Sequence, residues 1–236
     1  MPVVCYCLLQ NGYRRYQQEA QQQRANCEAR ADWLHRYADQ QLQLANGIYA
    51  IDDVDQRLSW ERQWHDLIHH RDQERLSFGD EELLHYPTAD RLLVELENSL
   101  NEQQHEIEEA LRKRDNYNKL GNGLSDLAQE IERIRSQAYY YQRIGADGVY
   151  LYMMEGLARL EADYDRRRRE RNRRTSEVTN HLDRADRIQR DIRRELGDFA
   201  DLLLVDEQIT YHEHLQARLE DFSLRTELER LVTGAP

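Results

Sequence analysis

Residues 149–196 read VYLYMMEGLARLEADYDRRRRERNRRTSEVTNHLDRADRIQRDIRREL. This run contains no proline and a single glycine, Gly156. Apolar side chains recur every three or four residues on both sides of its middle, which is the spacing of one helix face. At about 1.5 Å per residue, a helix of this length would extend roughly 70 Å, more than twice the width of a small domain. The run therefore predicts a long helix in an elongated molecule.

The middle of this run, residues 165–177, contains no strongly apolar side chain. Seven arginines occur there within nine positions: Arg166, Arg167, Arg168, Arg169, Arg171, Arg173 and Arg174. One interpretation is a charged docking face for an acidic protein surface, with RNA or anionic lipid as weaker alternatives. The other is a solvated helix that pairs with itself, because Asp163, Asp165 and Glu170 each precede an arginine by four residues.

The segments before this run also show helical spacing. We expect a first helix between Asn11-Gly12 and Gly47, with small or polar residues in the first half of its apolar stripe. A second helix is expected from the Asp52-Asp53 cap to about Leu76. Residues 51–100 carry a local charge of about -8, so they are expected either to fold against the arginines or to meet them in another copy.

Proline and glycine set the remaining expected boundaries. Pro87 is expected to close a short turn, and Thr88 to cap the next helix, which should end at residues 121–123, Gly-Asn-Gly. A further helix is expected from Ser125 to the glycines at 145–148, with a last break at Gly197. The predicted fold is all-α, an elongated bundle of long amphipathic helices forming hairpins or a coiled coil, with essentially no β-sheet. We divide the chain into an apolar N-terminal segment (1–10), antiparallel helical hairpins (11–145), and a long helix with a polar, arginine-rich shaft plus a C-terminal helix (146–236). We expect the three parts to form one continuous structural unit.

Composition excludes several classes of protein. The chain has 236 residues, of which 39% are hydrophobic, and no apolar run long enough to span a bilayer. Its net charge of -12 argues against specific nucleic-acid binding. The three cysteines cannot form a disulfide framework, and the N-terminus lacks a secretory signal. We therefore expect an intracellular protein in a reducing compartment.

The densest aromatic patch surrounds the expected turn at residues 145–148. It comprises Tyr139, Tyr140, Tyr141, Tyr150, Tyr152, Met153 and Met154. Consecutive tyrosines point around a helix, so at least one must leave any single buried face. Tyrosine and methionine are enriched where protein surfaces meet, and this patch is therefore our candidate protein interface.

The N-terminal residues MPVVCYCLL are strongly apolar and precede Arg14-Arg15. The favoured interpretation is an extended segment that packs into a groove of this chain or a neighbour. The alternative is S-acylation of Cys5 and Cys7 beside a basic pair, which would anchor the chain to a membrane.

Motifs for metal binding are weak. Glu82-x-x-His85 and Glu102-x-x-His105 match the Glu-x-x-His element of di-iron bundles, but the first lies in a short turn and the second in a polar stretch. Histidines also cluster at 65, 69 and 70 and at 212 and 214, too few for a designed zinc site. We predict no metal site, no catalytic residues and no cofactor.

These observations favour a non-enzymatic structural or scaffolding subunit, which joins other protein chains in a homo- or hetero-oligomeric assembly. A peripheral membrane adaptor, anchored by the acylated N-terminus or the basic helix, is the first alternative. A helical-bundle metal-binding enzyme is the second.

Overall fold

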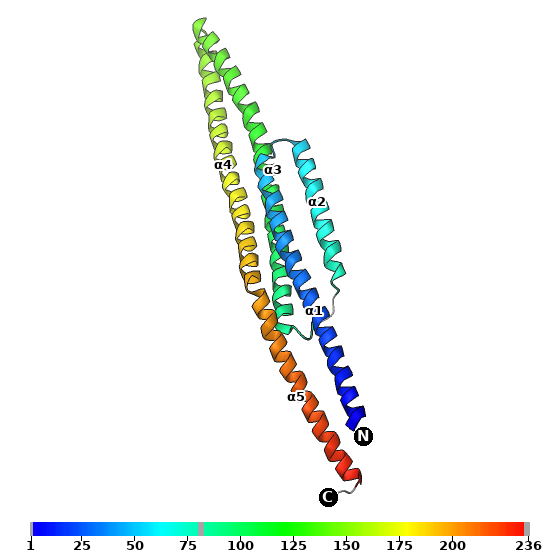
Figure 1. The fold of residues 1–236 in the computed structure, drawn as a ribbon. Helices are drawn as coiled ribbons and strands as arrows, with labels where there is room; N and C mark the ends of the chain where they lie inside the picture. Colours follow the sequence, from blue (N-terminus) through cyan, green and yellow to red (C-terminus); the bar gives the residue numbers. More distant parts are fainter. Residues whose placement is uncertain (1, 80–82, 234–236) are drawn as a thin grey trace. The chain divides into compact units, whose positions relative to one another are not determined.

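The chain folds into five α-helices and one short 3₁₀-helix, and its described residues contain no strand (Figure 1). The elements are α1 (Pro2–Ala45), η1 (Asn46–Ala50), α2 (Val54–Ser77), α3 (Pro87–Arg143), α4 (Asp147–Gly197) and α5 (Phe199–Thr233). This computed structural model describes the backbone of residues 2–79 and 83–233, and the side chains of 13–79 and 83–221. The all-α prediction is confirmed.

Three helix boundaries lie where a capping side chain or a glycine in the sequence predicts them. The side chain of Asp53 accepts a hydrogen bond from the backbone N–H of Gln56 (2.8 Å), which caps α2. Gly145 has φ of 76°, a conformation that favours glycine, and follows the end of α3. α4 ends at Gly197, as expected.

The predicted start of the first helix is wrong. α1 begins at Pro2 and continues through Asn11-Gly12, so the backbone of the apolar segment is helical and not extended. A glycine inside a helix costs only about 1 kcal/mol relative to alanine, and the helix formers that follow offset this. The side chains of Cys5 and Cys7 lie outside the described residues.

The predicted break at residues 121–123 is also wrong. α3 continues through both glycines, and no separate helix begins at Ser125. Two arginine side chains of α4 lie against these glycines: a Cβ built on Gly121 would be 3.4 Å from the guanidinium of Arg171, and one on Gly123 would be 3.6 Å from Nη1 of Arg167. The glycines therefore make room for a neighbouring helix.

α3 begins two residues earlier than a Thr88 cap predicts, and its cap comes from elsewhere in the chain. Pro87 is the first helical residue. The backbone N–H groups of Thr88 and Ala89 both donate to Oδ2 of Asp206, at 2.9 and 2.8 Å. Asp206 belongs to α5 and is almost fully buried. A carboxylate 118 positions away in sequence thus replaces the predicted Thr88 cap.

The structure divides into two compact units. Unit 1 contains Met1–Ala38, His69–Asn101 and Arg190–Pro236, and unit 2 contains Asp39–Ile68 and Glu102–Gln189. In unit 2 the second part of α3 and the first part of α4 run antiparallel and side by side (Figure 1). Their facing residues include Glu106 with His181 and Arg135 with Glu161.

Unit 2 has an apolar core close to its α1 and α2 segments. It consists of Ala45, Ile48, Ile51, Trp60, Trp64, Ile107, Ala110, Val178, Leu182 and Ala185. The rings of Trp60 and Trp64 stack at 5.3 Å, and their indole nitrogens donate to the backbone oxygen of Leu44 (2.9 Å) and to Glu108 (3.3 Å). Each indole N–H thus has a hydrogen-bond acceptor, although the ring that carries it is packed in the core.

Unit 1 combines an apolar core with a buried arginine. Its most buried apolar residues include Cys27, Leu34, Leu93, Leu100, Ile192 and Leu203. Arg30 is 5% exposed and binds Asp90 (2.8 Å) and Glu97 (2.7 Å) of α3. Removing one partner of a buried ion pair is strongly destabilising, so this cluster fixes how α1 packs on α3.

Candidate functional site

The turn between α3 and α4 is closed by paired backbone hydrogen bonds. The N–H of Ala146 donates to the carbonyl of Tyr141 (3.0 Å), and that of Gly145 donates to the carbonyl of Gln142 (3.2 Å). This is the Schellman arrangement, and it satisfies the last carbonyls of α3. The carbonyl of Ala146 then accepts the first hydrogen bond of α4 from Tyr150 (3.1 Å). The turn is therefore tight and holds the side chains around it in place.

The hairpin end, which we define as residues 139–154, carries a large exposed apolar surface. Its exposed large apolar residues are Tyr139, Tyr140, Ile144, Val149, Leu151, Tyr152 and Met154. Each is at least 38% exposed, and Tyr152 is 78% exposed. Tyr141, Tyr150 and Met153 are half-buried. Tyr140, Val149, Tyr152 and Met153 line a shallow groove of about 590 Å³. Of the predicted aromatic patch, the structure brings Tyr140, Tyr141, Tyr152 and Met153 together at this groove, and Tyr139, Tyr150 and Met154 do not line it.

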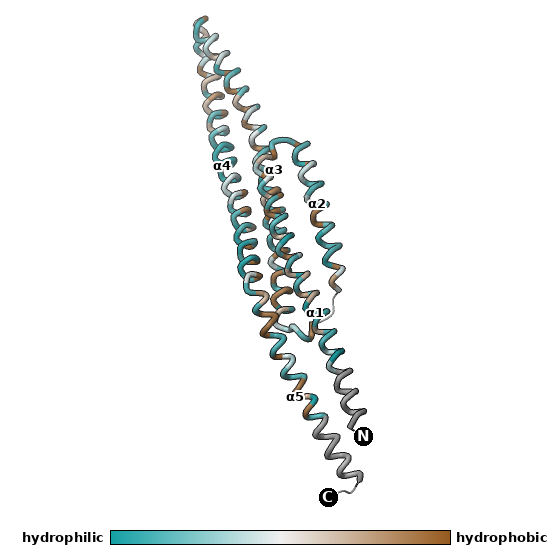
Figure 2. Tube along the Cα trace, in the orientation of Figure 1, coloured by the Kyte–Doolittle hydropathy of each residue, from teal (hydrophilic) through white to brown (hydrophobic). Residues whose placement is uncertain are grey.

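The predicted arginine run lies along the middle of α4, which is largely hydrophilic (Figure 2). Part of it pairs with acids of the same helix: Asp163 binds Arg167 at 2.9 Å and also contacts Arg166. None of these contacts involves residues 51–100, so the expected fold of the acidic segment against the arginines is not found among the described residues.

Glu177 binds three basic side chains near the C-terminal end of the arginine run. It binds Lys113 of α3 (3.2 Å), Arg173 (3.1 Å) and Arg174 (2.9 Å). Partial burial alone raises the pKa of this carboxyl, but hydrogen bonds from Lys113, Arg174 and Arg173 outweigh burial and lower the pKa to about 2. Glu177 therefore stays ionised well below neutral pH.

Arg171 packs across α3 instead of pairing with an acid. Its guanidinium lies 4.4 Å from the centre of the Tyr117 ring, and that of Arg114 lies 4.7 Å from the same ring. Arg114 also donates to the backbone oxygen of Ile51 (2.9 Å). Two cation–π contacts on one tyrosine hold both arginines against the helix pair.

Four arginines of the run border a groove that Leu120 of α3 also lines, and we call it the arginine groove. It has a volume of about 630 Å³ and is lined by Leu120, Arg166, Arg167, Arg169, Glu170 and Arg173. Glu170 is bound by Arg174 at 2.8 Å. Arg168 and Arg169 are exposed, and neither has an ion pair among the described residues. The predicted docking face thus includes both paired and unpaired cations.

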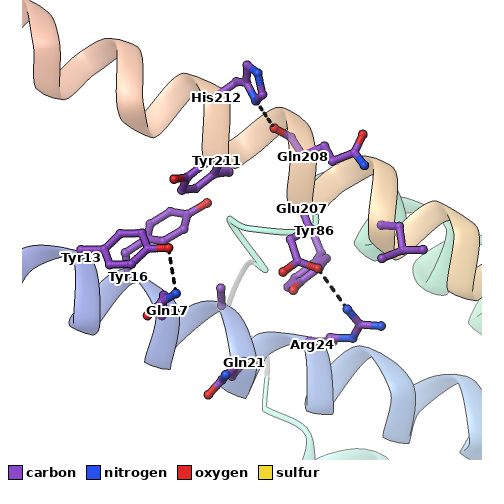
Figure 3. A pocket seen from close by; sticks show the side chains of 12 residues that line it. Tyr13, Tyr16, Gln17, Gln21, Arg24, Tyr86, Glu207, Gln208, Tyr211 and His212 are labelled. Carbon is purple, nitrogen blue, oxygen red and sulfur yellow. Dashed lines mark hydrogen bonds and ion pairs between the residues drawn. The ribbon is translucent and has the colours of Figure 1, made fainter.

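A third hollow lies in unit 1 between α1 and α5, and we call it the tyrosine cleft (Figure 3). Its volume is about 720 Å³, within the usual range of ligand pockets. The lining residues are Tyr13, Tyr16, Gln17, Ala20, Gln21, Arg24, Tyr86, Leu204, Glu207, Gln208, Tyr211 and His212. Arg24 and Glu207 form an ion pair of 3.0 Å across it. Tyr211 approaches Tyr13 and Tyr16 from the opposite helix, with ring centres 6.3 Å apart in both pairs.

Tyr16 also contacts two aromatic rings that do not line the tyrosine cleft. Tyr16 stacks on His214 at 4.2 Å and meets the edge of His85 at 4.7 Å. Burial, followed by the charge of Arg218 and by His85, lowers the pKa of His214 and so favours its neutral form. Burial also raises the pKa of Tyr86 to about 12, with Glu207 adding to the effect. These groups can hold an aromatic or apolar group by contact.

The residues considered for metal binding are scattered. His105 and Glu102 are exposed, and Glu82 lies outside the described residues. His181 makes a contact of 2.6 Å with Glu106, a pair that the sequence did not indicate. Among the residues that the structure describes, no group of three or more His, Cys, Asp or Glu could hold a metal ion.

The third cysteine, Cys27, is fully buried as a free thiol in unit 1. Burial raises the pKa of this thiol to about 12 and outweighs the opposing effect of the nearby Arg30, while Asp90 and Asp206 add smaller upward contributions. A neutral, inaccessible thiol is a poor nucleophile and a poor metal ligand, so Cys27 acts as a small core residue.

Comparisons of the chain with models of protein families, with curated proteins and with solved structures found no match. Across the described residues, no helix has a stretch long and apolar enough to cross a membrane. The tyrosine cleft was missed from the sequence because Tyr16 and Tyr211 are nearly 200 positions apart, and nothing local joins them.

Proposed function

We propose that this chain is a non-enzymatic structural component that joins protein chains through the hairpin end of unit 2. The observation that carries the proposal is the exposure of seven large apolar side chains around one tight turn. Exposed apolar patches of several hundred Å² are uncommon on monomers and mark interaction sites. Because the turn is already ordered by its backbone hydrogen bonds, little conformational entropy is lost when a partner covers it.

The first partner that we propose is a second copy of the same chain. The exposed surface of these seven side chains is on the order of 600–1,000 Å² if each large side chain offers about 150–250 Å² when fully exposed. Two copies that cover all of it would bury on the order of 1,200–2,000 Å², the size of a specific and stable interface. A symmetric contact also brings the same tyrosines face to face, and tyrosine is enriched among residues that dominate binding energy.

Sedimentation velocity and light scattering of the full chain test this proposal. We expect a dimer that persists at high ionic strength, because apolar burial is not screened by salt. The double variant Tyr140→Ser/Tyr152→Ser should be monomeric and equally helical, since both side chains are exposed. The matched control Leu76→Ser/Leu84→Ser removes two equally exposed apolar side chains from unit 1 and should remain dimeric. A wild-type monomer at all concentrations, or a double variant that still dimerises, would refute the proposal.

A further inference from the structure

We propose that the arginine groove of unit 2 binds an acidic amphipathic helix of a partner protein, with carboxylates at i, i+3 and i+7 around a leucine-like side chain. This inference rests on the proposed function and deepens it by naming the chemistry of a second partner. The groove and the hairpin end involve different residues, so each can be removed without the other.

The spacing of the groove arginines selects for a helix. Arg166, Arg169 and Arg173 are at i, i+3 and i+7 of α4, which places them on one face at steps of about 4.5 and 6 Å along the axis. A helix lying alongside α4 repeats this spacing when its carboxylates follow the same pattern. Leu120 of α3 is half-buried in the same groove and offers hydrocarbon contact to an apolar side chain between those carboxylates.

The local charge is positive in a chain that is negative overall. Residues 163–177 contain seven arginines and four acids, whereas the whole chain carries -12. The α3 stretch that surrounds Leu120, residues 116–125, has no acid and one lysine. Arg169 has no ion pair among the described residues, so a partner carboxylate would be its first. The local charge therefore favours a negative partner at this groove.

The groove cations are partly ordered before any partner binds. Arg166 contacts Asp163, and Arg173 binds Glu177 (3.1 Å). A guanidinium has five N–H donors, so each arginine can keep its present partner and still donate to an incoming carboxylate. Ordering in advance lowers the side-chain entropy that binding would otherwise remove.

Glu170 distinguishes an acidic helix from a continuous polyanion. Its carboxylate lines the groove between Arg169 and Arg173 and is held there by Arg174. A phosphate backbone, with closely spaced charges, would have to place negative charge beside it. A helix can instead place a leucine at that point and its carboxylates on either side, so the groove favours the helix.

Fluorescence anisotropy with the full chain tests the proposal. The probe is a labelled helical peptide with glutamates at i, i+3 and i+7 around a leucine, and the reference is the same peptide with glutamines. We expect binding that weakens as salt rises, and no binding of the glutamine peptide. The triple variant Arg166→Gln/Arg169→Gln/Arg173→Gln should weaken binding about tenfold or more, from three pairs of modest strength. The control Arg133→Gln/Arg184→Gln/Arg194→Gln removes three exposed cations elsewhere and should change affinity less than about twofold.

Two further measurements distinguish an acidic helix from a polyanion as the ligand of the arginine groove. Leu120→Ser should weaken binding of the peptide and leave any binding of heparin unchanged. Heparin that binds more tightly than the peptide, with no effect of Leu120→Ser on the peptide, would identify a polyanion surface and overturn the proposal. Absence of peptide binding at low salt, or equal binding by the triple variant, would also overturn it. The Tyr140→Ser/Tyr152→Ser variant should bind the peptide like the wild type, so failure of self-association leaves this test intact.

Discussion

Asp206 is the residue whose removal tests most directly how unit 1 is held together. One oxygen of its buried carboxylate accepts the backbone N–H groups of both Thr88 and Ala89, at the first turn of α3. The variant Asp206→Ala leaves both donors without a partner and removes a negative charge from the positive end of a helix dipole. Loss of an N-cap costs about 0.5–2 kcal/mol, and a charge at a partly buried helix end contributes up to about 2 kcal/mol. We therefore expect Asp206→Ala to lower the free energy of unfolding by about 1–4 kcal/mol.

Asp206→Asn separates the two contributions to this loss. Asparagine keeps an oxygen that can accept both hydrogen bonds but carries no charge, so the loss should be about 1 kcal/mol. The measurement is urea unfolding followed by circular dichroism, with the midpoint shifting at constant slope. Hydrogen exchange at Thr88 and Ala89 should accelerate in Asp206→Ala before the rest of unit 1 is affected.

The control for these variants is Glu213→Ala. Glu213 is an exposed residue of the same helix and has no polar contact within the described part of the chain, so its loss should stay within about 0.5 kcal/mol. If Asp206→Ala destabilises no more than Glu213→Ala, the carboxylate does not hold the start of α3, and the interpretation of this contact is wrong.

Two other predictions concern titration and reactivity. Because the pKa of Glu177 is lowered to about 2 in the folded chain, its contribution to stability is complete above about pH 4.5 and disappears as the pH falls towards 2. Urea midpoints of wild type and Glu177→Gln should therefore differ at pH 7 and converge near pH 2, and a constant difference would contradict this. Burial and a pKa of about 12 should make Cys27 react with iodoacetamide only after unfolding. Mass spectrometry in a Cys5→Ser/Cys7→Ser background reads this out, and rapid labelling of the native chain would contradict it.

The type of each helix was predictable because amphipathic spacing is a local property. The helix boundaries at Asp53, Gly145 and Gly197 were predictable as well, since a capping carboxylate or a glycine acts within one turn of its own position. Gly121 and Gly123 led to the wrong prediction of a helix end, because the contact that explains these glycines involves a distant part of the sequence. Those glycines face arginines of α4, about 45 to 50 positions later in the chain, and sequence spacing does not reveal that contact.

The candidate sites also differ in whether their residues are close together or far apart in the sequence. The hairpin end and the arginine run were predictable, because each is a contiguous stretch of unusual composition. The tyrosine cleft was not, because Tyr16 and Tyr211 come from opposite ends of the sequence. The cap supplied by Asp206 was missed for the same reason: an acid in the middle of an amphipathic helix gives no sign of a distant partner.

The order in which the two units can be completed during synthesis follows from their segments. Unit 2 consists of Asp39–Ile68 and Glu102–Gln189, so all its residues have been made before α5 begins. Unit 1 needs its last segment, from Arg190 onward, and the first turn of its α3 waits for Asp206. On a ribosome that adds about 5–20 residues per second, the N-terminal part of α1 is exposed for several seconds before α5 arrives to cover it. The unit that contains the first residues to be made is thus the last to be completed, because it needs the C-terminal helix.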